Sequence, residues 1–169
     1  MLFAETETQT MLCDMLVKLL DTENGFEAHR ARLNATPPDR MALWPHLAQQ
    51  GVLGAGFSED AGGFGGTMRD LAVVMGEVGR TLAVEPVLSS ILGGRLLGDA
   101  RAVVAGEQVL ALALSEGGFD PLAMPKTQVD AEGRIYGQKV AARHADLAQV
   151  LIVSASQNGE AGLWAVEAS

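Results

Sequence analysis

The pattern of hydrophobic and polar positions divides the chain into two parts with different periods. Up to residue 107, hydrophobic residues recur every three or four positions, which is the spacing of amphipathic helices. From residue 108 onward, apolar residues occupy consecutive positions or alternate with polar ones, which is typical of strands. The pattern therefore predicts an α+β fold. An N-terminal all-α helical domain (residues 1–107) is followed by a truncated, mostly antiparallel β domain (residues 108–169).

The first part contains five predicted helices and a short helical piece. The most regular apolar face belongs to the helix of residues 67–82, which carries Met68, Leu71, Met75, Val78 and Leu82 at helical spacing. Thr67 can cap this helix, and Asp70, three residues later, is a weaker form of the capping-box acid. The other predicted helices cover residues 2–21, 26–33, 39–50 and 86–97, with the short piece at 99–106.

The second part contains strands and tight turns. Residues 108–114 are apolar on both faces, which predicts a strand that is buried on each side. Residues 126–130 and 134–140 flank a short glycine turn and predict a hairpin, and residues 149–155 and 162–167 predict another.

Glycines are concentrated in residues 51–66, which read GVLGAGFSEDAGGFGG. No Gly-Lys-Ser/Thr follows them, and no GxGxxG motif lies at a strand-to-helix turn, so a phosphate loop is rejected. We interpret the run as a tight connection packed between helices. Glu59 and Asp60 within it could act as a carboxylate pair, although acids at a turn tip are more often solvated.

Composition narrows the function classes. The net charge of −9, with no stretch rich in lysine and arginine, argues against nucleic-acid binding. The single cysteine excludes an internal disulfide, and the three histidines lie at no metal-binding spacing, so no metal site is predicted. The first residues lack the features of a signal peptide, and no apolar run approaches membrane-spanning length. A cytoplasmic location is therefore expected.

Several motifs follow one another in a specific order. WPHLAQQGVLG (44–54), FSEDAGGFGG (57–66) and DLAVVMGEVGR (70–80) lie in the first part, and ALSE (113–116), GQK (137–139) and ADLAQVLIV (145–153) lie in the second. Over nearly the whole chain, this order resembles the acyl-CoA dehydrogenase family, with Ser58 where a proline is usual. It is closest to the branch that contains the smaller subunits of two-subunit enzymes acting on dicarboxylic or sterol-derived thioesters.

The resemblance implies a subunit of three parts: N-terminal helices, a middle β domain and a C-terminal four-helix bundle. It also implies FAD as cofactor and oxidation of an acyl-CoA thioester to the 2,3-enoyl-CoA, in fatty acid or sterol catabolism. An electron-transfer flavoprotein or similar acceptor and a homo- or hetero-oligomeric assembly are the implied partners. The bundle with the catalytic glutamate is absent from these 169 residues. No catalytic residue is therefore predicted, and the fragment is not expected to hold FAD alone.

By the same resemblance, Leu112, Leu114 and Ser115 would approach the isoalloxazine ring of FAD, with Ser115 as hydrogen-bond donor. An apolar strand with a polar end explains these residues equally well. Ala141 replaces the aromatic residue that covers the flavin in the family, and Arg143 replaces a flavin-bonding threonine. Residues 117–121 lack the family's substrate-contacting serine.

These departures leave two alternatives beside a dehydrogenase. One is a non-catalytic partner subunit with a decayed flavin site, and the other is a flavin oxidase or monooxygenase of the same fold.

Overall fold

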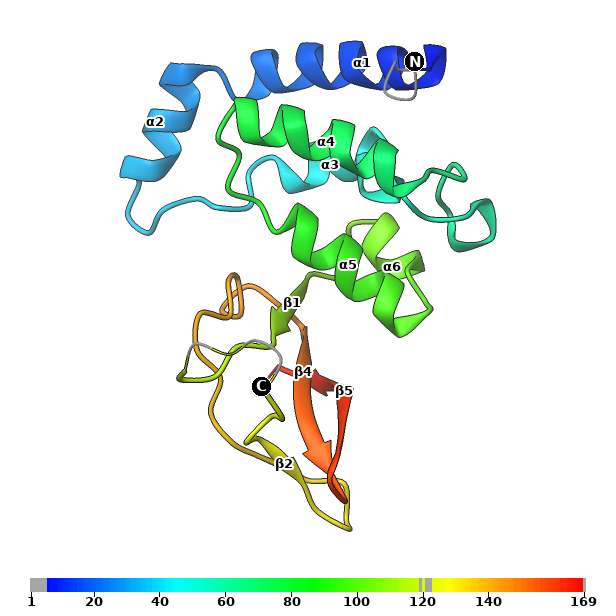
Figure 1. Cartoon of the computed structure of the whole chain (residues 1–169). Coiled ribbons are helices and arrows are strands. Elements are labelled where there is room, and N and C mark those ends of the chain that lie inside the picture. The colour runs from blue at the N-terminus through cyan, green and yellow to red at the C-terminus, as the bar shows by residue number, and fades with distance from the viewer. Residues whose placement is uncertain (1–5, 119, 121–122, 169) are drawn as a thin grey trace.

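The structure of the chain, a computed structural model, describes residues 6–118, 120 and 123–168. The helices form one part of the molecule and a small sheet forms the other (Figure 1). The two parts meet where α5 (Val87–Leu97) lies against β1 (Leu110–Ala113). This arrangement confirms the predicted α+β fold. Within the described residues, no helix combines the length and the apolar composition needed to cross a membrane.

The helices begin and end close to their predicted bounds, with one exception. The predicted helix of residues 39–50 begins only at Trp44, because Pro45 lacks an N–H group and is favoured in a first turn. Residues 2–5 of the first predicted helix lie outside the described part of the chain. The helical segments besides α5 are α1 (Glu7–Glu23), α2 (Phe26–Asn34), α3 (Trp44–Gln49), α4 (Met68–Arg80), α6 (Arg101–Val104) and the 3₁₀ turns η1 (Val52–Gly54) and η2 (Glu59–Ala61).

A capping box fixes the start of α4 and connects it to α1. The Thr67 side chain accepts a hydrogen bond from Arg69 N, and Asp70 Oδ2 accepts one from Thr67 N at 2.6 Å. Gln9 Nε2 on α1 donates to the other oxygen, Asp70 Oδ1, at 3.0 Å. The predicted capping pair is therefore confirmed, and it also holds two helices together.

The apolar face predicted for α4 is too long. Leu71, Val74 and Val78 are buried, but Met68 is 52% exposed and Leu82 is 67% exposed. Met68 is the first residue of the helix, and Leu82 lies beyond its last residue, Arg80. Helical spacing identifies the correct face, but it does not show where the cover of neighbouring elements ends.

The glycine-rich run folds back on itself. A Cβ atom on Gly63 would lie 2.4 Å from Phe57 O and 2.7 Å from Gly54 O, so only glycine fits there. Glu59 and Asp60 lie in η2 and are exposed. The run is therefore a tight connection between packed elements, as predicted.

Strand β4 (Val150–Gln157) is the centre of the sheet. Strand β1 pairs in parallel with its first half, and β2 (Gln128–Val129) pairs in parallel with β4 at Ser156. Strand β5 (Glu160–Glu167) pairs antiparallel along the whole of β4, and β3 (Ile135–Tyr136) pairs antiparallel with β2. Both predicted hairpins are confirmed. The sheet is mixed because β1 and β2 run parallel to β4.

Strand β1 is also held by helix α5. The hydroxyl of Ser90 accepts a hydrogen bond from Leu110 N at 3.1 Å and donates to Leu110 O at 3.4 Å, so it takes the place of a neighbouring strand. Gly93 allows close packing, because a Cβ there would lie 2.9 Å from Leu110 Cβ. The predicted burial of this strand is therefore confirmed at Leu110 and Ala111, but it does not extend to Leu114, which lies past the strand and is exposed.

The hydrophobic core lies between the helices and extends into the start of the sheet. Trp44 is buried in it and donates a hydrogen bond from Nε1 to Gly106 O at 2.8 Å. Val109, Ala111 and Ala148 bring the sheet into the same core. Because the two parts share one core, the position of β1 against the helices is fixed. The bulkiest fully buried side chains include Leu16, Leu20, Leu43, Leu47, Leu53, Ile91, Leu110 and Ile152.

Candidate functional site

Strand β1 carries a row of leucines that leads from the core to the surface. Leu110 is fully buried, Leu112 is half-buried, and Leu114, one residue past the strand, is 43% exposed. Strand alternation places these leucines on one face of the sheet. The register puts Ile152 of β4 beside Leu112 on that face. An apolar side chain is therefore presented at the carboxyl end of β1.

Ser115 follows at an exposed position. Its carbonyl oxygen accepts a hydrogen bond from Val140 N at 2.9 Å, which fixes the backbone at this point. Within the described part of the chain, its hydroxyl has no hydrogen-bond partner. The three predicted site residues thus lie together at one strand end. The two leucines share a face, and Ser115 lies beyond the last paired residue of β1.

Glu116 is the next residue, and its carboxylate collects donors from two other segments. Oε1 accepts hydrogen bonds from Thr127 N (2.9 Å), Thr127 Oγ1 (2.7 Å) and Lys139 Nζ (2.7 Å). Oε2 accepts one from Lys126 N at 2.7 Å. The end of β1 is therefore tied to the residues just before β2 and to the segment after β3.

Lys139 extends this network to the centre of the sheet. Its ammonium group also donates to Ser154 Oγ at 2.9 Å, and Ser154 Oγ donates to Leu114 O at 3.0 Å. The side chains of Lys139 and Glu116 are only 9% and 16% exposed. The hydrogen bond from Lys139 is the main reason why the pKa of the Glu116 carboxyl lies far below its usual range. The Thr127 hydroxyl and the backbone N–H groups of Lys126 and Thr127 lower this pKa further. The Glu116 carboxyl is therefore ionised at neutral pH.

Close packing against Thr127 explains why position 137, two residues before Lys139, is a glycine. A Cβ atom there would lie 2.4 Å from Thr127 Oγ1 and 2.7 Å from Thr127 Cα. Only glycine lets the chain leave β3 so close to Thr127. The Gly-Gln-Lys motif thus has a structural basis, because its glycine and its lysine both serve contacts around Glu116.

The loop that follows Lys139 lies next to Ser115 through the Val140 hydrogen bond. Ala141 and Arg143 in this loop are both exposed, and Ala141 has a φ of +54°. Neither side chain offers an aromatic ring or a hydroxyl group. His144, at the end of the loop, is half-buried, and burial lowers the pKa of its imidazole. In the segment 117–121, Phe119 and Pro121 lie outside the described residues.

Sequence reasoning missed Thr127 and Ser154. Both act through hydroxyl groups that no motif marks, and they lie in or beside strands that converge only in the folded sheet. Ser154 directly follows the ADLAQVLIV motif, but its spacing gives no sign of a contact with Leu114 or Lys139. The motifs ALSE (113–116) and GQK (137–139) contain Glu116 and Lys139, but neither motif indicates the contacts that these residues make.

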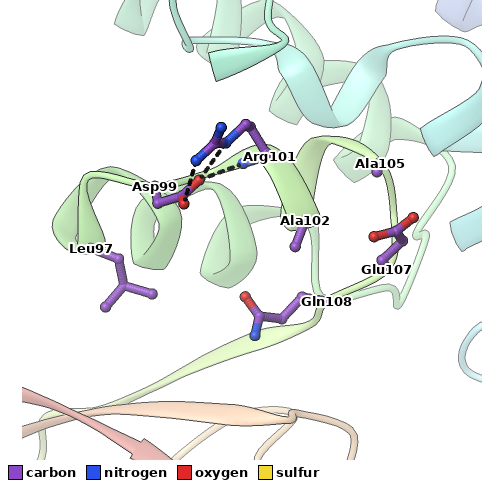
Figure 2. Close-up of a pocket in the computed structure, with 7 residues that line it drawn as sticks. All are labelled: Leu97, Asp99, Arg101, Ala102, Ala105, Glu107 and Gln108. Carbon is purple, nitrogen blue, oxygen red and sulfur yellow. Dashed lines mark hydrogen bonds and ion pairs between the residues drawn. The ribbon is translucent and has the colours of Figure 1, made fainter. Parts of the chain in front are cut away.

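A shallow pocket of about 520 Å³ lies elsewhere, between the end of α5, α6 and the segment that leads into β1 (Figure 2). Arg101 turns back onto Asp99 there and forms an ion pair with it at 3.1 Å. The pocket contains none of the predicted site residues. Among the described residues, no group of three or more His, Cys, Asp or Glu side chains could hold a metal ion. The lining residues are Leu97, Asp99, Arg101, Ala102, Ala105, Glu107 and Gln108.

The chain belongs to the class of proteins in which a helical part is followed by a mixed β-sheet. The candidate site lies at the exposed end of one strand of that sheet. Residues 6–98, more than half of the chain, match the family described as "Acyl-CoA dehydrogenase, N-terminal domain". The chain therefore belongs to the acyl-CoA dehydrogenase family.

Individual relatives show the same similarity. The acyl-CoA dehydrogenase FadE34 of Mycobacterium tuberculosis is 30% identical over 120 residues, which are 69% of this chain and 16% of FadE34.

Two solved structures share the fold over almost the entire chain. A variant of the Tcur3481–Tcur3483 steroid ACAD has a TM-score of 0.87 and 28% identity, and covers 96% of this chain and 48% of that chain. The ChsE4–ChsE5 complex from Mycobacterium tuberculosis has a TM-score of 0.86 and 24% identity, and covers 99% of this chain and 49% of that chain. The chain thus spans about half the length of these structural relatives.

Proposed function

We propose that this chain supplies the N-terminal part of an FAD-dependent acyl-CoA dehydrogenase that oxidises an acyl-CoA thioester to the 2,3-enoyl-CoA. FAD, when bound, supplies the acceptor for the electrons of this oxidation. The proposed division of labour assigns residues 1–107 to the helical domain and residues 108–169 to the β domain. Family membership supports the reaction class.

The observation that carries the proposal is the exposed end of β1. Leu114 presents apolar surface there, and Ser115 presents a hydroxyl group that has no partner within the described chain. A flavin ring has apolar faces and a hydrogen-bonding edge, so these two groups fit its chemistry. We assign Leu112, Leu114 and Ser115 to flavin contact and assign no catalytic residue within this chain.

The similarity to a steroid ACAD favours a sterol-derived thioester over a simple fatty acyl thioester. The Tcur3481–Tcur3483 and ChsE4–ChsE5 structures each carry the names of two proteins, which favours a hetero-oligomer for this chain as well. An electron-transfer flavoprotein or similar carrier would take the electrons onward.

The test uses the full-length protein with any subunit that copurifies. Flavin absorbance is measured first, followed by dye reduction with fatty acyl and steroid side-chain CoA thioesters. Leu114→Asp should weaken FAD binding at least about tenfold, because it puts a charge against an apolar ring. Leu33→Asp on α2 is the matched control, since Leu33 is 44% exposed and Leu114 is 43% exposed. A wild-type protein without flavin, or equal FAD affinity in both variants, would contradict the proposal.

The exposed loop beside Ser115 favours a second candidate, a non-catalytic partner subunit whose flavin site has decayed. Ala141 and Arg143 provide neither the aromatic cover nor the hydroxyl group of a standard flavin site. In that case the purified complex would hold FAD only in the partner subunit. One FAD per copy of this chain would exclude it.

A further inference from the structure

The Glu116–Lys139 ion pair connects four separate segments of the described β domain. Glu116 extends the end of β1, and its carboxylate binds the backbone of residues 126 and 127 before β2. Lys139 comes from the segment after β3 and binds Ser154 in the middle of β4. A single pair of charges therefore joins parts of the chain that the sequence separates widely.

An ion pair with so little exposed surface is a poor source of stability. Removing two charges from water costs about as much free energy as their attraction returns, and well-packed apolar residues often do as well. What a largely buried, hydrogen-bonded pair provides is a defined geometry, because each charge must face its partner. Here every oxygen of Glu116 has a donor, and Lys139 has two acceptors.

The geometry is imposed on the two residues just before Glu116. Ser154 Oγ accepts a hydrogen bond from Lys139 Nζ and donates one to Leu114 O. Val140, directly after Lys139, donates from its backbone N–H to Ser115 O. The carbonyl groups of Leu114 and Ser115, two of the three proposed flavin-contact residues, are therefore oriented by groups that Lys139 fixes. The side chains of these two residues stay exposed.

We propose that Glu116, Lys139 and Ser154 are positioning residues that hold Leu114 and Ser115 in the orientation needed to bind the flavin. This inference rests on the proposed function, because it concerns the same strand end. It assigns to the three residues a role that neither substrate contact nor overall stability requires. Their contribution is to reduce the number of orientations that the strand end can adopt before the cofactor arrives.

The experiment measures the dissociation constant for FAD and the visible absorption spectrum of bound flavin in the full-length protein after reversible removal of flavin. Ser154→Ala is the mild variant, since it removes one hydroxyl group and leaves the ion pair in place. Lys139→Met removes the charge and keeps most of the side-chain volume. We expect the dissociation constant to rise about threefold for Ser154→Ala and about tenfold or more for Lys139→Met. The flavin spectrum should shift in both.

The matched control is Arg134→Met, which breaks the Asp130–Arg134 pair on the same β2–β3 hairpin. Arg134 is 65% exposed, and among the described residues no hydrogen bond or ion pair joins it or Asp130 to Glu116, Lys139 or Ser154. The control should bind FAD like the wild type. Wild-type affinity and spectrum in both Ser154→Ala and Lys139→Met would overturn this inference alone and leave the proposed function standing. A wild-type protein that binds no FAD would overturn both.

Discussion

The close packing of α5 on β1 can be tested by adding one methyl group. In Gly93→Ala, the new Cβ would lie 2.9 Å from Leu110 Cβ and 3.0 Å from Leu110 Cδ1, which is too close without movement. Overpacking of this kind costs about 1–3 kcal/mol. Alanine is the better helix former by about 0.5–1 kcal/mol, which offsets part of that cost. We therefore expect a net destabilisation of about 1–2 kcal/mol.

Gly76→Ala on α4 is the matched control. Gly76 is also a helical glycine, but apart from the adjacent backbone of α4 itself, no heavy atom of the described residues lies within 4 Å of a Cβ built there. This variant should gain only the higher helix propensity of alanine, and so be more stable than the wild type by about 0.5–1 kcal/mol. The two variants should thus differ by about 2 kcal/mol, or roughly 4–8 °C in Tm for a chain of this size.

Urea denaturation followed by circular dichroism measures both variants against the wild type. The reasoning would be refuted if Gly93→Ala were as stable as Gly76→Ala, because β1 would then not lie against α5 at the distance described. A loss confined to Gly93→Ala would confirm that the helical part sets the position of the strand whose end forms the candidate site.

Two further predictions concern buried polar groups. Ser90→Ala should cost about 1–3 kcal/mol in the same denaturation assay, because it leaves the buried N–H and C=O of Leu110 unpaired. Ser89→Ala, which removes only a bond to Pro86 O within the start of the helix, should change stability by less than about 0.5 kcal/mol, and an equal loss in both would contradict the role given to Ser90. Glu85 is 6% exposed, and burial raises the pKa of its carboxyl although Leu43 N donates to it. Its contribution to stability is therefore fully present below the unfolded pKa of about 4.3 and is lost as pH rises through the folded pKa. As the pH rises from 4 to 8, the wild type should therefore lose stability relative to Glu85→Gln in urea denaturation. A gain of the wild type over Glu85→Gln would show instead that Glu85 has an ionic partner.

Local signals in the sequence predicted the local structure well. Thr67 and Asp70 predicted a cap because the atoms involved lie within one helical turn. The β4–β5 hairpin followed from two apolar runs and the residues between them. The parallel pairing of β1 with β4 could not be predicted in this way, because nothing within either strand specifies a partner about 40 residues away.

The candidate site shows the same division. Leu112, Leu114 and Ser115 were found through a resemblance, and their role in flavin binding remains a prediction. The hydrogen bonds around Glu116 depend on Thr127, Lys139 and Ser154, which come together only after the sheet has formed. A hydroxyl group has no spacing rule that would reveal such a contact. The motif Gly137-Gln138-Lys139 contains the lysine of this network, but it does not show which groups the lysine contacts.

The parallel pair of β1 and β4 has a consequence for the order in which the molecule folds. Strands β4 and β5 pair over their full length across a short turn, and such hairpins form within microseconds. Strand β1 can join only after the whole intervening segment has closed into a loop, which is entropically costly and slow. We therefore expect the hairpin to form early and β1 to dock late, together with α5. The strand end that carries Leu114 and Ser115 would then be among the last features of the molecule to reach its final form.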